Sequence, residues 1–201
     1  MVDRSGKFDG DNPFDICKRW IAESEEGELN DPNAIALSTV SEDGMPNVRM
    51  VLLKNIDQSA FVFFTNFGSQ KAVEIFDCGK ASFVWHSKFL RRQIRVRGVT
   101  SLESEQASDE YYKSRSLKSR LGAWASIQSK PLNSRKILLD RVEKFTESLG
   151  DDPERPKFWG GFRIIPTAIE FWAEGEARLH DRFLWTKRDP DGQWSIERLY
   201  P

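Results

Sequence analysis

Arg178-Leu179-His180-Asp181-Arg182 lies between two apolar runs, residues 168–172 and 183–185. If this stretch is extended, alternate side chains share a face, so Arg178, His180 and Arg182 point to the same side. Three groups that can carry positive charge repel each other on one strand face unless something negative lies over them. The pattern therefore predicts either a bound anion or electron-rich ring at this face, or a solvated face with water and salt between the charges.

The length and composition predict one soluble domain. A chain of 201 residues is long enough for one well-formed core and short for two, and its 39% apolar and 30% charged content is ordinary for a globular protein. The formal net charge of −1 provides no general attraction to nucleic acid or to a membrane surface, so positive charge has to act in local clusters. Residues 1–12 are polar and are expected to be a flexible lead, with residues 13–201 as the single domain.

The cysteines and the N-terminal segment predict a protein of the cytoplasm. Cys17 and Cys78 lack CxxC spacing and nearby histidines, which argues against a zinc site or a disulfide framework and fits a reducing compartment. The first seven residues carry no apolar secretion signal, and no apolar run approaches transmembrane length. We therefore expect a cytoplasmic protein with no metal site and no membrane partner.

Hydrophobic periodicity and turn signals predict an antiparallel α+β barrel. Helices are expected after Asn12, Ser69, Ser104 and residues 133–134, because each position carries a capping residue before a helical pattern. Strands are expected at residues 34–40, 47–54, 61–66, 81–85, 92–100, 161–165, 168–172, 179–185 and 194–199. Neither a GxGxxG motif nor a Walker loop is present, so dinucleotide-binding and P-loop folds have no support.

Two further clusters have the chemistry of phosphate binding. Gly68-Ser69-Gln70-Lys71 opens a helix, where free backbone amides beside a lysine bind anions easily, although a plain capped helix has the same pattern. Tyr111, Arg115 and Ser119 recur every four residues and would form one stripe of a helix. A phenol, a guanidinium and a hydroxyl supply the donors that a phosphate monoester needs, but a polar helix face is the alternative for this cluster.

Taken together, these clusters closely resemble the pyridoxine/pyridoxamine 5′-phosphate oxidases. The resemblance runs from about residue 13 to Pro201, and it is specific because many separate motifs occur in the order found in that family. The matching segments are residues 49–54, 64–66, 68–71, 92–93, 111–119, 122–124, 128–129, 158–163, 170–172 and 178–182. The resemblance implies an α+β fold, an antiparallel Greek-key split β-barrel with flanking helices of the FMN-binding split-barrel type. It also implies a homodimer with FMN at the subunit interface.

The same resemblance assigns site residues by position. The implied FMN contacts are Arg49, Met50, Val51, Leu52, Leu53, Lys54, Phe64, Thr65, Ser69, Gln70, Lys71, Gln93, Gln128, Ser129, Trp172 and Arg182. The implied substrate-binding residues are Lys54, Tyr111, Arg115 and Ser119 around the phosphate, with Arg178 and His180 over the pyridine ring as the catalytic pair. Gln70 stands where many relatives carry a basic residue, so one phosphate contact would be neutral. Arg49 and Lys54 have opposite parity on a regular strand, so a bulge or a strand end is expected between them.

The implied activity is oxidation of pyridoxine 5′-phosphate or pyridoxamine 5′-phosphate to pyridoxal 5′-phosphate, in vitamin B6 biosynthesis or salvage. A hydride equivalent would pass from C4′ of this phosphorylated pyridine to flavin N5, and O2 would reoxidise the flavin to give H2O2, with NH3 released from the amine. The preference between alcohol and amine stays open. One alternative is an FMN oxidase of another aromatic substrate, such as a phenazine precursor, and another is a flavin-binding protein without turnover.

A nucleic-acid binder is a further alternative class. Arg91-Arg92, Arg95 and Arg97 would supply its positive charge. The near-neutral net charge and the lack of an aromatic platform on that strand argue against this reading.

Overall fold

The computed structural model describes residue 4, residues 6–189 and residues 192–201 of the chain. Its helices are η1 (Gly6–Phe8), α1 (Pro13–Ser24), α2 (Gln70–Cys78), α3 (Glu105–Ser114), α4 (Leu117–Ala125), α5 (Arg135–Leu149) and η2 (Glu176–Arg178). Its strands are β1 (Ala34–Val40), β2 (Pro46–Ile56), β3 (Phe61–Asn66), β4 (Lys80–Ser87), β5 (Arg92–Leu102), β6 (Trp159–Ala173), β7 (Asp181–Thr186) and β8 (Ser195–Leu199). Within these residues, no helix has both the length and the apolar character needed to cross a membrane.

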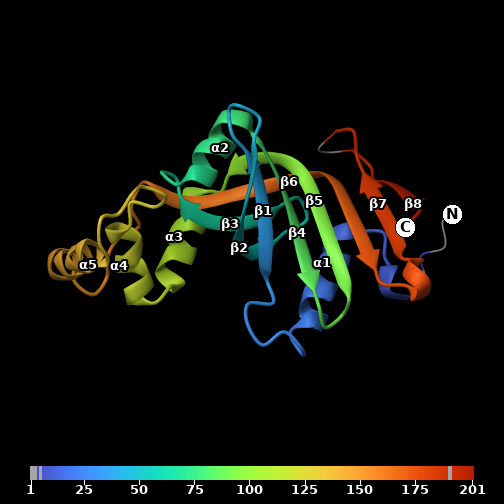
Figure 1. Cartoon of the computed structure of the whole chain (residues 1–201), viewed down its shortest axis with the longest axis horizontal. Helices are drawn as coiled ribbons and strands as arrows, with labels where there is room; N and C mark the ends of the chain where they lie inside the picture. The colour runs from blue at the N-terminus through green and yellow to red at the C-terminus, as the bar shows by residue number, and fades with distance from the viewer. Residues whose placement is uncertain (1–3, 5, 190–191) are drawn as a thin grey trace.

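Six antiparallel strands close into a barrel (Figure 1). The strand order is β3-β2-β1-β4-β5-β6-β7-β8, and β3 also pairs with β6, which joins the two ends of the first six strands. β7 and β8 continue the sheet beyond the barrel as an antiparallel extension. The α+β class and the antiparallel barrel with flanking helices are therefore as the sequence predicts.

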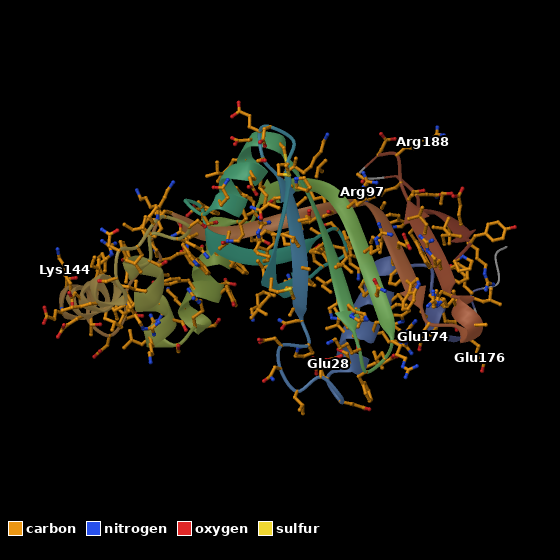
Figure 2. All side chains as sticks on the ribbon, in the orientation of Figure 1. Glu28, Arg97, Lys144, Glu174, Glu176 and Arg188 are labelled. Atoms are coloured by element: carbon orange, nitrogen blue, oxygen red, sulfur yellow. The ribbon has the colours of Figure 1, made fainter. Side chains whose placement is uncertain are left out.

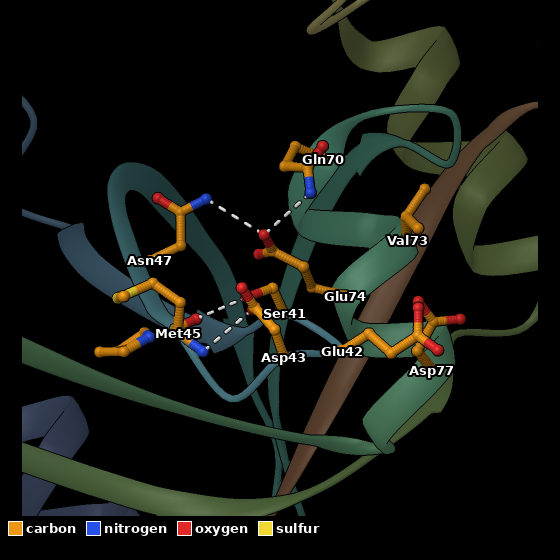
Figure 3. Close-up of a pocket in the computed structure, with 10 residues that line it drawn as sticks. Ser41, Glu42, Asp43, Met45, Asn47, Gln70, Val73, Glu74 and Asp77 are labelled. Atoms are coloured by element: carbon orange, nitrogen blue, oxygen red, sulfur yellow. Dashed lines mark hydrogen bonds between the residues drawn. The ribbon is translucent and has the colours of Figure 1, made fainter.

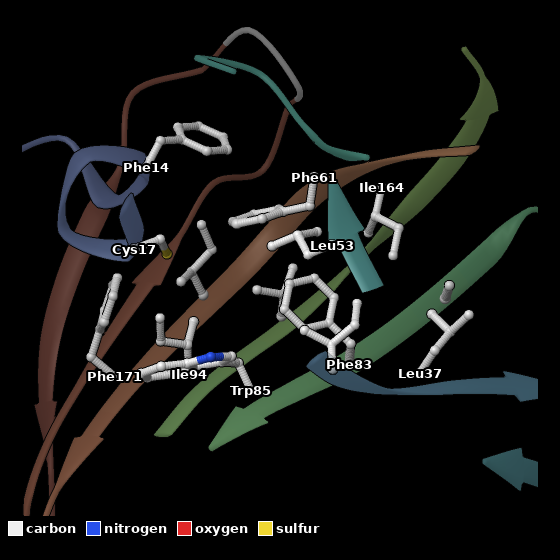
Figure 4. Packing of buried hydrophobic residues seen from close by; sticks show 14 of the residues in the cluster. Phe14, Cys17, Leu37, Leu53, Phe61, Phe83, Trp85, Ile94, Ile164 and Phe171 are labelled. Carbon is white, nitrogen blue, oxygen red and sulfur yellow. The ribbon is translucent and has the colours of Figure 1, made fainter. Parts of the chain in front are cut away.

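Alternating burial along the strands builds the barrel core. In β5, Ile94 and Val96 are buried whereas Arg95 and Arg97 are exposed, which is the period-two pattern of a strand with one face in the core. Figure 4 shows side chains of α1 and of β1–β6 meeting inside the barrel. The helix α1 covers this core with one apolar face, because its apolar residues recur at helical spacing.

The N-terminal segment also contributes to the core. Phe8 of η1 is 3% exposed, and its ring centroid lies 4.7 Å from that of Phe183 in β7 and 5.5 Å from that of Trp20 in α1. The composition of residues 1–12 is polar, so the sequence did not predict that Phe8 would be buried. The flexibility expected for that lead stays a prediction.

One long strand replaces two predicted short ones. Residues 161–165 and 168–172 both belong to β6, which passes Pro166 opposite a register shift at Gly98 of β5. A Cβ at Gly98 would lie 2.1 Å from the carbonyl oxygen of Ile165, so only glycine allows the two strands to approach this closely. The shift lets one strand continue past a proline that cannot donate to the sheet.

The predicted single helix around Tyr111, Arg115 and Ser119 is wrong, because the chain breaks it in the middle. The helix α3 ends at Ser114, and Arg115 takes an extended conformation with φ −76° and ψ 150°. Ser116 then accepts a hydrogen bond from the Ser119 amide and caps α4, which restarts the helix in a new direction. The three side chains therefore do not share one helical stripe.

The predicted strand face around His180 is also wrong. The strand β7 begins at Asp181, so Arg178, His180 and Arg182 do not alternate along one strand. Arg178 lies in a turn with φ 64°, in the left-handed region. Gly175 permits the turn, because a Cβ there would lie 2.0 Å from a carbonyl oxygen of the same turn. The repulsion expected on a regular strand is therefore relieved by the backbone itself.

Candidate active site

A cavity of about 370 Å³ lies where β2, β3 and α3 meet. Four cationic side chains line it, and none of the described lining residues is acidic. The cations are Arg49, Lys54, Lys71 and Arg115, and the other lining residues are Met50, Val51, Leu52, Phe64, Thr65, Asn66, Tyr111, Gln128 and Trp159. An excess of positive charge in a partly enclosed space favours an anionic ligand, because charges interact more strongly where water is reduced.

Lys71 places a buried ammonium group at this cavity. The side chain stands in the first turn of α2, is 7% exposed, and donates from Nζ to Thr65 Oγ1 at 3.3 Å and to Ser69 Oγ at 3.2 Å. Burial lowers the pKa of Lys71, and the positive charge of Arg49 lowers it further, while Glu74 opposes this. Ser69 occupies the N-cap position as predicted, but its hydroxyl accepts from the lysine and not from a backbone amide.

Lys54 reaches the same cavity because of a bulge in β2. Leu53 pairs with Phe63 and Asn55 pairs with Val62, which leaves Lys54 as the additional residue in the ladder. Its Nζ lies 5.9 Å from the ring centroid of Tyr111. Of the bulge or strand end expected between Arg49 and Lys54, the structure has the bulge, at Lys54 itself, and both residues line one cavity.

Three aromatic rings form one wall of the cavity. Phe64 stacks on Tyr111 with 4.2 Å between centroids and lies near-parallel to Trp159 at 5.6 Å. Trp159 is 6% exposed, and sequence reasoning did not select it as a site residue. The glycines that follow it were the available signal, since a Cβ at Gly161 would lie 2.8 Å from the Phe64 ring. A flat apolar wall beside cations suits an aromatic ligand with a negative group.

Arg115 is a cation that lies against aromatic rings and has one buried donor without a partner in the described residues. Its guanidinium lies 4.8 Å from the Trp159 ring centroid and 5.9 Å from that of Tyr112. Its Nη1 is buried and has no hydrogen-bond partner in the described part of the chain. Burial lowers the pKa of Arg115, with opposing contributions from Tyr111 and Tyr112. Buried donors are normally paired, so this one fits the contact of a bound phosphate.

Ten of the predicted site residues do not line the cavity, and five of these belong to the loops and elements around it. The side chain of Leu53 lies in the barrel core, and that of Gln70 donates to Glu74 Oε1 at 3.0 Å. The side chain of Ser69 supports Lys71. Ser119 and Ser129 are exposed. The roles assigned to these residues stay predictions.

The remaining predicted residues form a second group, at one end of β5, β6 and β7. Gln93 pairs with Trp172, and Trp172 pairs with Arg182, in register across the three strands. The rings of Trp172 and His180 lie 4.7 Å apart. Arg178 is exposed beside them in the turn.

Hydrogen bonds fix two members of this second group. Arg182 donates from Nε to Oε1 of Glu170 at 2.9 Å, and Glu170 is itself 8% exposed. His180 Nδ1 accepts from the Gly175 amide at 3.3 Å. In a neutral imidazole the proton then resides on Nε2, which remains available as a donor.

The two groups lie far apart within one chain. Figure 1 places α3 and α4 at one end of the barrel and β7 at the other, and Figure 2 shows Lys144 of α5 and Glu176 of η2 at opposite ends of the molecule. Within the described residues, none of the second group lines the cavity that contains Arg115. One protomer therefore brings together the predicted residues of β2, β3, α2 and α3, but not those of β5–β7.

Comparison with known families gives two matches that together span most of the chain. Residues 21–148 match the family described as pyridoxamine 5′-phosphate oxidase. Residues 159–201 match the pyridoxine 5′-phosphate oxidase C-terminal dimerisation region, which indicates a homodimer. The second match contains β6, β7 and β8, and so most of the second group.

Curated relatives are similar over their whole length. The pyridoxine/pyridoxamine 5′-phosphate oxidase of Roseobacter denitrificans is 61% identical over 201 residues, covering 100% of both chains. The protein of the same name from Cereibacter sphaeroides is 62% identical over 200 residues, again covering 100% of both.

Solved structures share the fold. PhzG from Burkholderia lata, determined in complex with tetrahydrophenazine-1-carboxylic acid, superposes with a TM-score of 0.90 at 28% identity and covers 100% of this chain and 98% of its own. A pyridoxamine 5′-phosphate oxidase-related, FMN-binding protein from Nostoc punctiforme has a TM-score of 0.77 at 20% identity, covering 94% and 98%. The predicted split-barrel type is therefore confirmed for the fold.

Proposed function

This chain belongs to the pyridoxamine 5′-phosphate oxidase family, and we propose that it oxidises pyridoxine 5′-phosphate or pyridoxamine 5′-phosphate to pyridoxal 5′-phosphate. The electron acceptor is O2, and the products include H2O2, with NH3 from the amine. The observation that carries the proposal is the cavity with four cations, no described acidic residue and an aromatic wall. Its chemistry suits phosphorylated aromatic molecules.

The proposed cofactor is FMN, which when bound supplies the two-electron oxidation. Arg49, Lys71 and Thr65 would hold its phosphate, because all three line the cavity and Lys71 Nζ donates to Thr65 Oγ1 at 3.3 Å. Gln128 lines the same cavity and lies within 3.5 Å of Thr65 Oγ1, so it would contact the flavin as well. Buried Lys71 fits this assignment, since its ammonium has only hydroxyl partners for hydrogen bonding in the described residues.

The substrate phosphate would be held by a second set of lining residues. Arg115 offers a buried donor without a partner in the described residues, and Lys54 Nζ lies 5.9 Å from the Tyr111 ring centroid. Ser119 would add a hydroxyl from the start of α4. A guanidinium, an ammonium and a phenol together supply the donors that a phosphate monoester requires.

The second group would complete the site from the other protomer of a homodimer. In one chain this group lies away from the cavity, and most of it falls in the segment that matches the dimerisation region. In the proposed dimer, Gln93, Trp172 and Arg182 of one protomer face the flavin bound by the other. Arg178 and His180 would lie over the pyridine ring, where His180 Nε2–H donates to a ring substituent and Arg178 helps to exclude water.

An absorption spectrum tests the proposal. The purified protein is expected to show flavin bands that are bleached anaerobically by pyridoxamine 5′-phosphate and restored by O2, with H2O2 formed. A colourless protein that retains no flavin after incubation with FMN and gel filtration would remove the cofactor assignment. A yellow protein that is not bleached would retain flavin binding and remove the activity. We also propose a cytoplasmic location, which the two free cysteines support.

The similarity to PhzG favours one other candidate, an FMN oxidase of a non-phosphorylated aromatic substrate. That relative is 28% identical, whereas the curated phosphate oxidases reach 62%. Arg115 distinguishes an oxidase of phosphorylated substrates from an oxidase of non-phosphorylated ones, because a substrate without phosphate leaves the buried Nη1 of Arg115 unpaired. Turnover of pyridoxamine 5′-phosphate but not of pyridoxamine would favour the B6 oxidase.

A further inference from the structure

Glu74 is a buried carboxylate in contact with Arg49 of the cationic cavity, and it has no role in the proposed reaction. Glu74 of α2 is 3% exposed and lies in the wall of a separate, open cleft of about 790 Å³ between α2 and the β1–β2 hairpin. Figure 3 shows Asn47 and Gln70 converging on this carboxylate from two sides of the cleft. Glu74 is not among the residues that line the cationic cavity.

Four hydrogen-bond donors meet the two oxygens of Glu74. Oε2 accepts from the Thr39 hydroxyl and from Arg49 Nη2 at 3.3 Å. Oε1 accepts from Asn47 Nδ2 at 3.2 Å and from Gln70 Nε2 at 3.0 Å. An ionised carboxylate only accepts hydrogen bonds, whereas an amide of the same shape would turn an N–H toward one of these donor pairs. The site therefore requires a carboxylate and not merely a side chain of this size.

The same network fixes the guanidinium of Arg49. Its Nη1 donates to the Leu37 carbonyl oxygen at 3.2 Å and to Thr39 Oγ1 at 2.6 Å, and its Nη2 donates to Glu74. Arg49 Nε has no partner in the described part of the chain, although the residue lines the cationic cavity. A guanidinium has five N–H donors, so three are used for support and two remain for a ligand.

Two effects of Glu74 on a bound phosphate oppose each other. A negative charge this close to an anion site weakens binding by direct repulsion. A rigid Arg49 strengthens binding, because less side-chain entropy is lost when the phosphate is bound. The sign of the change on removing the charge therefore shows which effect dominates.

We propose that Glu74 is a positioning residue for the cofactor phosphate, which acts by holding Arg49 so that its free donors face the cationic cavity. This inference rests on the proposed function, since it takes the flavin phosphate as the anion in that cavity. Gln70 then serves the site indirectly, by binding Glu74 and not the phosphate.

Equilibrium binding of FMN and of riboflavin to the apoprotein tests the proposal without turnover. Glu74→Gln is expected to weaken FMN binding about tenfold, the scale of one impaired charge-assisted hydrogen bond, and to leave riboflavin binding unchanged because riboflavin lacks the phosphate. Glu42→Gln is the matched control, since Glu42 is an exposed acid in the wall of the same cleft. Unchanged or tighter FMN binding by Glu74→Gln would overturn the proposal.

A double-mutant cycle separates positioning from a general structural role. In an Arg49→Lys background, Glu74→Gln is expected to cause no further decrease in the ratio of FMN affinity to riboflavin affinity, because its effect passes through Arg49. An equal loss in both backgrounds would contradict the mechanism. If Glu74→Gln does not fold, Thr39→Val removes the hydroxyl that links Arg49 to Glu74 and should weaken FMN binding in the same direction.

The two failures have different signatures. A wild-type protein that binds FMN no better than riboflavin would remove the proposed cofactor site, and this inference with it. A wild-type protein that prefers FMN and oxidises pyridoxamine 5′-phosphate, together with unchanged FMN binding in Glu74→Gln, would remove only the role of Glu74.

Discussion

Replacing Arg115 with methionine should separate substrate binding from protein stability. Methionine keeps an unbranched apolar stem against Trp159 but removes the guanidinium. In the protein without ligand, the buried Nη1 has no partner in the described residues, which costs about 1–3 kcal/mol of folding free energy. The substitution relieves that cost but loses a cation–π contact, 4.8 Å from the Trp159 centroid, of about 0.5–2 kcal/mol.

These opposing terms predict almost no net change in the stability of the apoprotein. The midpoints of the two ranges differ by less than about 1 kcal/mol, which corresponds to a Tm change of about 4 °C or less for a chain of this size. In the complex the same group would donate to the substrate phosphate, and losing one charge-assisted hydrogen bond of about 1.5–3 kcal/mol raises KM about 10- to 100-fold. FMN affinity should change far less, because Arg49 and Lys71 are proposed to hold the cofactor phosphate.

Steady-state kinetics with pyridoxamine 5′-phosphate, thermal unfolding of the apoprotein and FMN titration together measure this prediction. Arg120→Met is a matched control, since Arg120 lies on α4 and pairs with Asp152 at 2.6 Å outside the cavity. That variant should leave KM unchanged. An unchanged KM in Arg115→Met, or a Tm loss well beyond 4 °C, would refute the role of Arg115 as a cation held ready for substrate.

The dimeric site, the pH dependence of stability and the burial of Phe8 can each be tested. Arg115→Met and His180→Ala should each reduce activity. When the two variants are mixed and their subunits reassort, activity should recover to about a quarter of wild type, because half the dimers contain one subunit of each variant and each of these has one intact site. No recovery would argue for a site within one chain. The pKa of Glu74 is lowered because, although burial raises it, hydrogen bonds from Thr39, Gln70 and Asn47 and the charge of Arg49 outweigh that effect. A carboxylate with a lowered folded-state pKa stabilises the protein at pH values above its unfolded pKa of about 4.5. Urea unfolding should therefore show the full stability advantage of wild type over Glu74→Gln at about pH 6–7. That advantage should disappear as the pH falls below about 4.5 and through the folded-state pKa. Phe8→Ala should destabilise by about 3–5 kcal/mol, seen as a lower urea midpoint, and a loss under about 1 kcal/mol would place Phe8 outside the cooperative core.

Local patterns were sufficient for much of the barrel and for one part of the site. The alternation of Ile94, Arg95 and Val96 predicts which face of β5 is buried, and the burial agrees. The family resemblance places Arg49 and Lys54 in one pocket, and their opposite parity then predicts a bulge or a strand end; the ladder has a bulge at Lys54. The burial of β5 depends on neighbours within one strand, so short-range spacing contains that information.

Other features required the folded chain. The helix breaks at Arg115 because Ser116 caps a new helix there. Helical spacing alone does not show whether the chain forms one continuous helix or ends one helix and starts another. Phe8 is buried by Trp20 of the next helix and by Phe183, which comes from the far end of the chain.

By itself, the sequence determined most of the strand pattern and the family, and it predicted a set of site residues. Only the tertiary structure decided that this set divides into two groups, that Trp159 backs Arg115, and that Glu74 holds Arg49. The physical reason is separation along the sequence. Propensity and periodicity act over a few residues, whereas these contacts join segments that only the closed barrel brings together.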